Sequence, residues 1–116
     1  MFINDCYNRE IGYVTASNNI VIEESKIVKI NNVCYLYVYG HTNIGIGTGY
    51  FAVAIIPPNF LPNIPIVPSY AYINSDPNGG WGLCTATISR GIIALSVNGH
   101  DDQIYFQIAT TYLMTY

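Results

Sequence analysis

Apolar and polar residues alternate with a period of two along several short segments of the chain. The segment 33–39 shows the pattern well, because it separates two sets of three side chains. One face of this strand would carry Cys34, Leu36 and Val38, and the other Tyr35, Tyr37 and Tyr39. No segment has an apolar stripe at the helical period, and β-branched and aromatic residues fill short runs bounded by Asn, Gly and Pro. The pattern predicts an all-β protein.

About nine strands are predicted along the chain. They cover residues 12–16, 20–24, 26–30, 33–39, 50–56, 68–74, 83–89, 92–98 and 103–115. A parallel sheet needs crossover helices, and since none is predicted the strands should pair antiparallel. We expect residues 1–116 to form one domain, an antiparallel two-sheet sandwich of the jelly-roll type.

Two pairs of residues carry the signal for a two-residue hairpin turn. Asn31-Asn32 should be one of them, because asparagine tolerates the left-handed conformation that a type I′ turn needs at both central positions. Arg90-Gly91 should be the other, with Gly91 as the residue that is free to take a positive φ.

The segment 57–65 contains several prolines and is not predicted as a strand, because proline lacks the N–H that ladder pairing needs. We expect it to be a rigid crossover between sheets. Its apolar residues should anchor it to the core, which distinguishes it from a flexible linker. These residues are Phe60, Leu61 and Ile64.

Charge is scarce in this chain. Lys, Arg, Asp and Glu make up 9% of the residues, against about 25% in ordinary soluble domains, while 51% are hydrophobic. We therefore expect other subunits to bury part of the apolar surface. The alternative is that uncharged polar side chains, abundant here as Asn, Thr and Tyr, take the place of charges. The net charge of −3, with only 4 cations, makes nucleic acid an unsuitable partner.

The sequence offers no signal for membrane insertion or secretion. No uninterrupted apolar run approaches the roughly 20 residues of a membrane-spanning helix, and the first residues lack a signal-peptide core. Synthesis in a cytosol is expected. The 3 cysteines include no C-x-x-C pair and have no histidine at ligand spacing, which disfavours a disulfide framework and a zinc site. Cys34 and Cys84 are expected in the core.

The tyrosine face of the segment 33–39 has three possible interpretations. The rings stack along the sheet and cover a half-exposed face, they form a subunit interface, or they form a ligand platform. We favour the subunit interface, for which Tyr35, Tyr37 and Tyr39 are the candidate residues.

No catalytic constellation is apparent, and we predict that the protein is not an enzyme. No local signature of an activated nucleophile is present. Glu23 and Glu24 are neighbours in a strand, so they point to opposite faces and cannot act as a pair of glycosidase carboxylates. Three adjacent polar residues, His100, Asp101 and Asp102, suggest a cation or acid–base site, but such a turn is more often simply solvated. No cofactor or metal site is predicted.

Two predicted loops are candidates for ligand binding, because loops at one end of a sandwich combine a rigid base with free side chains. The first contains an indole that can stack on a sugar, with carboxylate and amide groups that can bond its hydroxyls. Its candidate residues are Trp81, Asp76, Asn78 and Asn74. The alternative for Trp81 is a role in the core or an interface. The second loop supplies His100, Asp101 and Asp102.

The order of these features carries a family resemblance. A basic-apolar strand KIVKI (26–30) is followed by the strand VCYLYV (33–38), the proline segment IIPPNFLP (55–62) and three closing strands between 83 and 113. This order resembles the C-terminal head domains of bacteriophage tail fibres and baseplate receptor-binding proteins. The proline segment is similar to the family's crossover of leucine, proline, any residue, glycine or asparagine, phenylalanine, any residue and proline.

The resemblance implies a function. Such heads form the distal tip of a homotrimeric fibre in the virion tail, beside other tail-fibre or baseplate proteins, and they bind a saccharide or a protein on the bacterial surface. Residues 1–11 would then be a lead-in from a shaft or a partner. The chain departs from the family because it begins at Met1 without coiled-coil heptads or a fibre repeat, as an excised tip or a separate gene product would. Two alternatives stay open, a structural trimerising cap without receptor binding and a free-standing lectin-like module.

Overall fold

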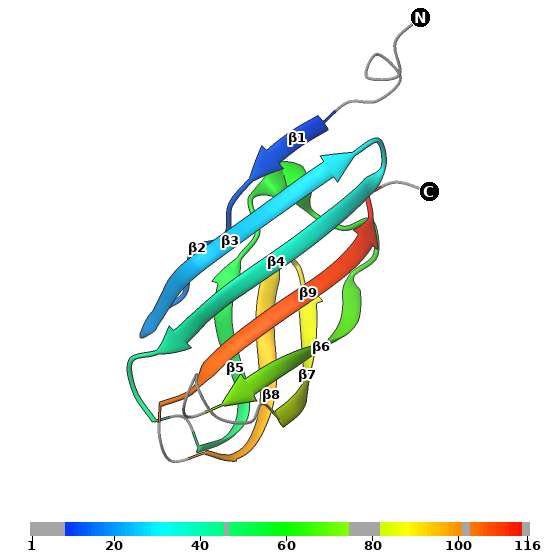
Figure 1. Ribbon diagram of the computed structural model, residues 1–116. Helices are drawn as coiled ribbons and strands as arrows, with labels where there is room; N and C mark the ends of the chain where they lie inside the picture. The colour runs from blue at the N-terminus through cyan, green and yellow to red at the C-terminus, as the bar shows by residue number, and fades with distance from the viewer. Residues whose placement is uncertain (1–8, 46, 75–81, 101–102, 115–116) are drawn as a thin grey trace, which may run out of the picture.

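The computed structural model describes residues 9–45, 47–74, 82–100 and 103–114. Within these residues the chain forms nine strands and one short 3-10 helix (Figure 1). The strands are β1 (Arg9–Gly12), β2 (Thr15–Ala16), β3 (Ile20–Ile30), β4 (Val33–Thr42), β5 (Gly47–Ile55), β6 (Ile66–Asn74), β7 (Gly82–Ser89), β8 (Ile92–His100) and β9 (Tyr105–Leu113), and the helix is η2 (Pro58–Phe60). The predicted all-β class is confirmed.

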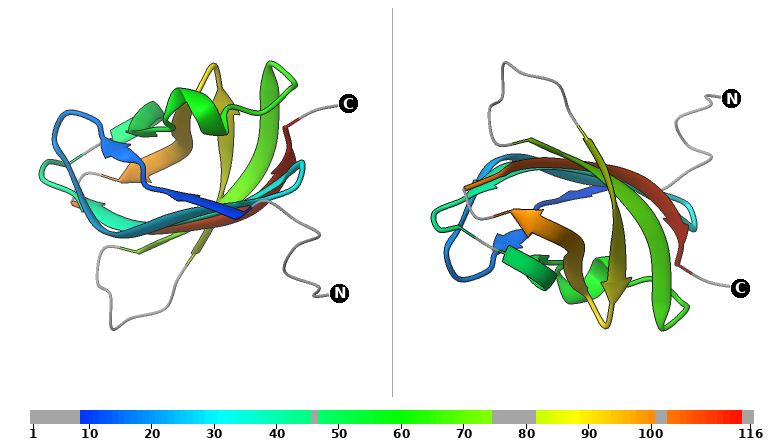
Figure 2. Two further views of the ribbon diagram at one scale, coloured as in Figure 1. Left: turned by 90° about the horizontal axis from the view of Figure 1, so that it is seen from above. Right: turned by 90° about the horizontal axis from the view of Figure 1, so that it is seen from below.

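All nine strands belong to one antiparallel sheet with the order β1-β3-β4-β9-β6-β7-β8-β5-β2. The sheet curls around a single interior (Figure 2). Its two edge strands, β1 and β2, follow each other along the chain and are separated only by Tyr13 and Val14. The expected two-sheet jelly roll is not confirmed, because hydrogen-bonded neighbours run without a break from one edge to the other.

Three of the predicted strands, 12–16, 20–24 and 26–30, have the wrong boundaries. The segments 20–24 and 26–30 form one strand, β3, whose register against β4 shifts at Glu23. This bulge explains why the polar run 23–25 looked like a break in the pattern. The segment 12–16 is in turn split, since β1 pairs with β3 and β2 pairs with β5. β1 also includes residues 9–11, the end of the segment 1–11 that was predicted as a lead-in.

The interior of the sheet is a single apolar core. Cys34, Leu36 and Val38 of β4 are all buried, as the alternation predicted. Phe106 and Ile108 of β9 are buried beside them, and every strand from β3 to β9 contributes to the same cluster. Burial raises the pKa of the Cys34 thiol, so this cysteine keeps its proton and is a core side chain.

Both predicted hairpin turns are confirmed by the pairing of the residues on either side. Asn31 takes a φ of 56°, and its neighbour Asn32 does not take a positive φ, so only one asparagine uses the conformation expected of both. In the second turn both residues use it, Arg90 with a φ of 53° and Gly91 with a φ of 81°. The positive φ favours glycine at position 91, and a Cβ there would also lie 2.7 Å from Cδ2 of Leu61, so that side chain would have to move.

The proline segment crosses over the end of the molecule that carries these two turns, hereafter the hairpin end. Phe60 of η2 is buried, its carbonyl accepts a hydrogen bond from the Tyr112 hydroxyl, and the Lys29 Nζ atom lies 5.6 Å from its ring centroid. Leu61 packs against the core as well. Ile64 is exposed, so the prediction that it anchors the segment was wrong. The opposite end of the sheet, where β4, β6 and β8 finish, is hereafter the loop end.

Candidate functional site

The outer face of the sheet carries the tyrosines of β4, and the strand register shows which residues lie beside them. Cross-strand partners point to the same face. Tyr37 is opposite Ala109 of β9, and Tyr39 is opposite Gln107. Gln107 is in turn opposite Tyr72 of β6, which is opposite Leu83 of β7. The tyrosine face of β4 therefore continues across three more strands.

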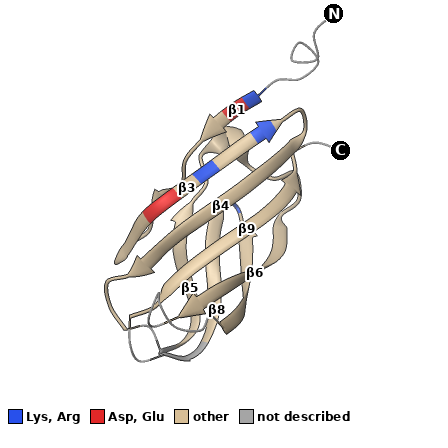
Figure 3. Ribbon diagram, viewed as in Figure 1, with Lys and Arg blue, Asp and Glu red and all other residues tan. Residues whose placement is uncertain are grey.

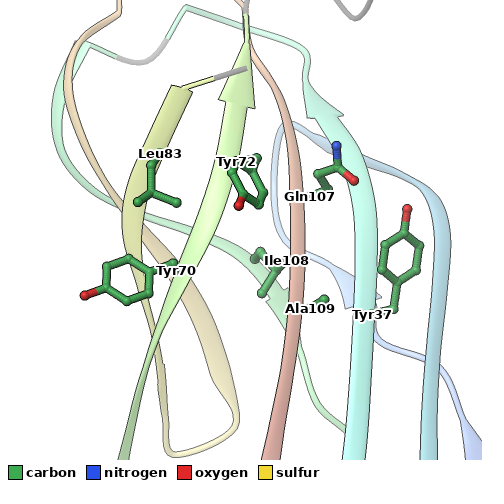
Figure 4. Close-up of a pocket in the computed structure, with 7 residues that line it drawn as sticks. All are labelled: Tyr37, Tyr70, Tyr72, Leu83, Gln107, Ile108 and Ala109. Carbon is green, nitrogen blue, oxygen red and sulfur yellow. The ribbon is translucent and has the colours of Figure 1, made fainter. Parts of the chain in front are cut away.

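A shallow hollow of about 390 Å³ lies on this face (Figure 4). We call it the tyrosine hollow, and its lining residues are Tyr37, Tyr70, Tyr72, Leu83, Gln107, Ile108 and Ala109. It forms because Ala109 is small while its neighbours across the sheet carry large rings. Tyr37 stands on one side, Tyr72 and Tyr70 on the other, and Gln107 lies between Tyr37 and Tyr72 (Figure 4). Tyr70 and Tyr72 are more than half exposed.

The lining of the tyrosine hollow is uncharged but can form hydrogen bonds. The Gln107 amide is both a donor and an acceptor, and the tyrosine hydroxyls can act in both ways. Burial raises the pKa of Tyr37, and the nearby Glu24 carboxylate raises it further. The Tyr37 hydroxyl therefore keeps its proton as a hydrogen-bond donor.

Charged side chains avoid most of the sheet (Figure 3). Within the residues that the structure describes, Lys, Arg, Asp and Glu occur only on β1, on β3 and, as Arg90, in the β7–β8 turn. Lys29 of β3 and Glu10 of β1 form an ion pair at 3.0 Å. The strands from β4 to β9 thus present an uncharged outer face, which is unusual for a surface in water.

A row of exposed aliphatic side chains crosses this uncharged face near the hairpin end. We call it the aliphatic belt, and it consists of Leu113, Ile66, Ile92 and Ile55, which are 55%, 55%, 44% and 47% exposed. Ile66 pairs with Ser89, Ser89 with Ile92, and Ile92 with Ile55. The aliphatic belt therefore lies near the hairpin end, and the tyrosine hollow, which also contains the exposed Leu83, lies nearer the loop end.

Thr42 organises the loop end. It is a fully buried polar residue at the end of β4. Its hydroxyl donates to the Ile44 carbonyl at 2.8 Å and accepts from the Ile104 amide at 3.0 Å. The Thr42 amide donates to the Ile104 carbonyl at 2.9 Å, and the Gln103 side chain donates to the Asn43 carbonyl at 2.8 Å. These bonds fasten the end of β4 to the start of β9.

Replacing Thr42 with valine should lower the free energy of unfolding by about 1–3 kcal/mol, because the Ile104 amide and the Ile44 carbonyl lose a buried partner. Urea titration measures the loss of unfolding free energy. Hydrogen exchange of the Ile104 amide should also become faster. The matched control is Thr111→Val, at an exposed position of β9, and it should leave the free energy of unfolding nearly unchanged. Equal losses in the two variants would contradict this role for Thr42.

The sequence-based candidates fall in two places. Tyr35, Tyr37 and Tyr39 all lie on the outer face, and Tyr35 is half exposed. Tyr39 stacks on Tyr105 with 6.5 Å between ring centroids.

The candidate loop residues that the structure describes lie at the loop end. Asn74 ends β6 opposite Tyr105, and His100 ends β8 opposite Gly47. Trp81, Asp76, Asn78, Asp101 and Asp102 lie outside the described residues. The described strands on either side of the two candidate loops have their adjoining ends at the loop end, where β6 and β8 finish and β7 and β9 begin.

Sequence reasoning missed most of the tyrosine hollow. Tyr70 and Tyr72 alternate with buried Ala71 and Ile73, so the pattern of β6 contained the signal that they share a face. The pattern did not say that β9 and β6 lie next to β4. That adjacency links residues far apart in the sequence, and it alone brings Ala109 between Tyr37 and Tyr70.

The remaining polar contacts do not suggest a reactive centre. Nδ1 of His41 lies 3.5 Å from Oε2 of Glu23, and its ring packs against Tyr105. Among residues 9–45, 47–74, 82–100 and 103–114, no three His, Cys, Asp or Glu side chains gather as metal ligands. No helix in the described part of the chain has the length and apolarity that crossing a bilayer requires.

The chain is similar in fold to two proteins of known structure. No family model and no curated protein sequence matches the chain. The receptor-binding head domain of lactococcal phage bIL170 is 17% identical, with a TM-score of 0.70 over 92% of this chain and 99% of that one. The receptor-binding protein gp15 of Listeria phage PSA is also 17% identical, with a TM-score of 0.66 over 95% of this chain and 67% of that one. This chain therefore has the fold of phage receptor-binding head domains.

Proposed function

We propose that the chain is a receptor-binding head of a bacteriophage or prophage tail fibre or baseplate, a non-enzymatic component of the virion tail. The observation that carries the proposal is the fold, which is similar over nearly the whole chain to two phage receptor-binding domains. Receptor-binding heads act by recognition alone, in keeping with the absence of a catalytic constellation in the sequence. Its partners are a glycan or a protein on the bacterial surface and neighbouring tail proteins.

The two ends of the sheet support different roles. The described chain starts at Arg9, which pairs with Ile30 at the hairpin end. At the opposite end β6 finishes and β7 begins, on either side of Trp81 in the sequence, and β8 finishes shortly before Asp101. A tip that is tethered near Arg9 would present the loop end to a cell, and the receptor would contact Trp81, Asp76, Asn78, Asn74, His100, Asp101 and Asp102.

We propose that the subunits of a homotrimer contact one another through the uncharged outer face. An exposed apolar row such as the aliphatic belt marks a protein interface more often than a free surface. In a cyclic trimer each subunit contributes two different patches, so one broad uncharged face can serve both neighbours. Tyr35 borders the aliphatic belt on β4 and belongs to this interface in our proposal.

The proposal is tested by incubating the labelled full chain with a panel of bacterial cells that includes Lactococcus and Listeria strains. We expect binding to at least one strain and a loss of about tenfold or more in Trp81→Ala, because indole rings act as binding anchors. Tyr13→Ala removes another exposed aromatic ring away from the loop end and should bind like the original chain.

Other results would point to the two alternatives. A trimer that binds no strain would overturn the receptor-binding role in favour of a structural cap. A monomer that binds glycans but no cells would favour a free-standing lectin-like module. Equal losses in Trp81→Ala and Tyr13→Ala would contradict the assignment of the receptor to the loop end.

A further inference from the structure

We propose that the tyrosine hollow is a binding subsite for a neutral saccharide, separate from the loop end. This inference rests on the proposed function and adds to it a second contact region and a ligand class. The hollow of about 390 Å³ is within the range of roughly 300–1,000 Å³ that is typical of small-ligand sites. It is open and shallow, so it suits one or two sugar units of a longer saccharide.

The aromatic walls match the apolar face of a sugar ring. Tyr37 lies on one side of Ala109 and Tyr72 on the other (Figure 4), and both residues line the hollow. An aromatic face packs against the C–H face of a sugar, and tyrosine adds a hydroxyl at the edge of that contact. Tyrosine also brings a large contact area at a low cost in side-chain entropy. Ala109 leaves the space between the rings free.

The polar groups of the hollow match the hydroxyls of the same ring. Gln107 lies between Tyr72 and Tyr37 and offers a donor and an acceptor to neighbouring hydroxyls. The raised pKa of Tyr37 keeps its hydroxyl as a donor at neutral pH. One face of a ligand can thus be packed while its edge forms hydrogen bonds.

The charge around the hollow favours a neutral ligand over an anionic one. None of the lining residues is charged. Beyond Tyr37 and Tyr39, strand β3 presents one cation, Lys26, and one carboxylate, Glu24, which balance each other. A phosphate-bearing polymer would find no cluster of cations here, whereas a neutral glycan loses nothing by entering an uncharged site.

A second copy of the chain is the competing occupant, and the surface chemistry argues against it. Four exposed aliphatic side chains form the aliphatic belt near the hairpin end, where removal from water gives the largest gain, whereas the lining of the hollow includes one, Leu83. The hollow instead exposes tyrosine hydroxyls and an amide, which a subunit contact would have to satisfy one by one. We therefore assign Tyr37 to the ligand platform and keep the belt for subunit contact.

The test uses the full chain and three neutral probes, namely tetramers of N-acetylglucosamine, of glucose and of rhamnose. We expect at least one probe to shift the backbone NMR signals of Gln107 and Ala109. Ala109→Ile fills the space between the rings with a residue suited to a strand, and it should weaken that probe about tenfold or more, which is about 1.4 kcal/mol. Thr111→Ile adds the same side chain to the same face of β9 two residues away and should bind the probe like the original chain.

Three results would overturn the inference. The first is that none of the three probes shifts Gln107 or Ala109. The second is that Ala109→Ile and Thr111→Ile weaken the probe equally. The third is that Ala109→Ile lowers the mass of the assembly in light scattering, which would make the hollow a subunit contact. Cell binding separates this inference from the proposed function, because the hollow can fail as a sugar site while Trp81→Ala still weakens attachment to cells.

Discussion

Replacing Phe106 with alanine should lower the free energy of unfolding by about 3–5 kcal/mol, a large part of the stability of a domain this size. Phe106, on the inner strand β9, is the largest fully buried side chain among the described residues. Its ring fills the space above Gly40 of β4, where an added Cβ would lie 3.1 Å from Cζ of Phe106 and 2.3 Å from the Val21 carbonyl. Since the neighbouring backbone has no side chain with which to close the gap, the variant retains most of the cavity.

Urea unfolding followed by circular dichroism measures this loss. Tyr50→Ala, which removes a ring that is 71% exposed, is the control and should cost less than about 1 kcal/mol. A loss below 1 kcal/mol in Phe106→Ala would mean that the core closes around the cavity and that the packing against Gly40 is not decisive.

Introducing a carboxylate into the aliphatic belt should convert the assembly to monomers. Ile66→Glu replaces a side chain that is more than half exposed in one chain, so the chain itself should still fold. In the proposed trimer the same position is removed from water, and an unpaired carboxylate there costs several kcal/mol. Light scattering across a dilution series should then give the mass of one chain for Ile66→Glu and three times that mass for the original protein.

The matched control is Ile44→Glu, which makes the same change at an exposed isoleucine that follows β4 at the loop end, away from the aliphatic belt. Ile44→Glu should remain a trimer. An original chain that is already monomeric at all concentrations would contradict the interface, and so would trimers in both variants.

Much of the fold could be predicted from local sequence because strands, turns and buried faces are local properties. The alternation in β4 and the Asn31-Asn32 turn were both sufficient signals. The long-range arrangement was not predictable in the same way. Nothing in the segment 12–16 shows that its two halves pair with opposite edges of one sheet, and the expected second sheet came from assuming that nine strands must form two layers.

The candidate site shows the same limit. Tyr37 could be placed on an outer face from its own strand, because its neighbours Leu36 and Val38 are apolar. The hollow beside it depends on Ala109, which is seventy-odd residues later in the sequence and has no local signal of function. A small residue becomes a site only when the neighbouring strands supply large ones, and that depends on sheet order. The scarcity of charge led to the expectation that other subunits bury part of the apolar surface, and the sheet order shows that the strands without charged residues lie side by side.

The attachment of β1 has a mechanical consequence for a protein held at its N-terminal side. Arg9 pairs with Ile30 at the hairpin end, and β1 runs from there along β3 toward the loop end. A force that pulls Arg9 away from the loop end acts along the axis of β1, so it loads all the ladder bonds of residues Arg9–Gly12 together in shear. The Glu10–Lys29 ion pair joins the same two strands and shares that load. A sideways force would instead break the bonds one at a time, so the joint resists tension along the long axis of the head better than bending.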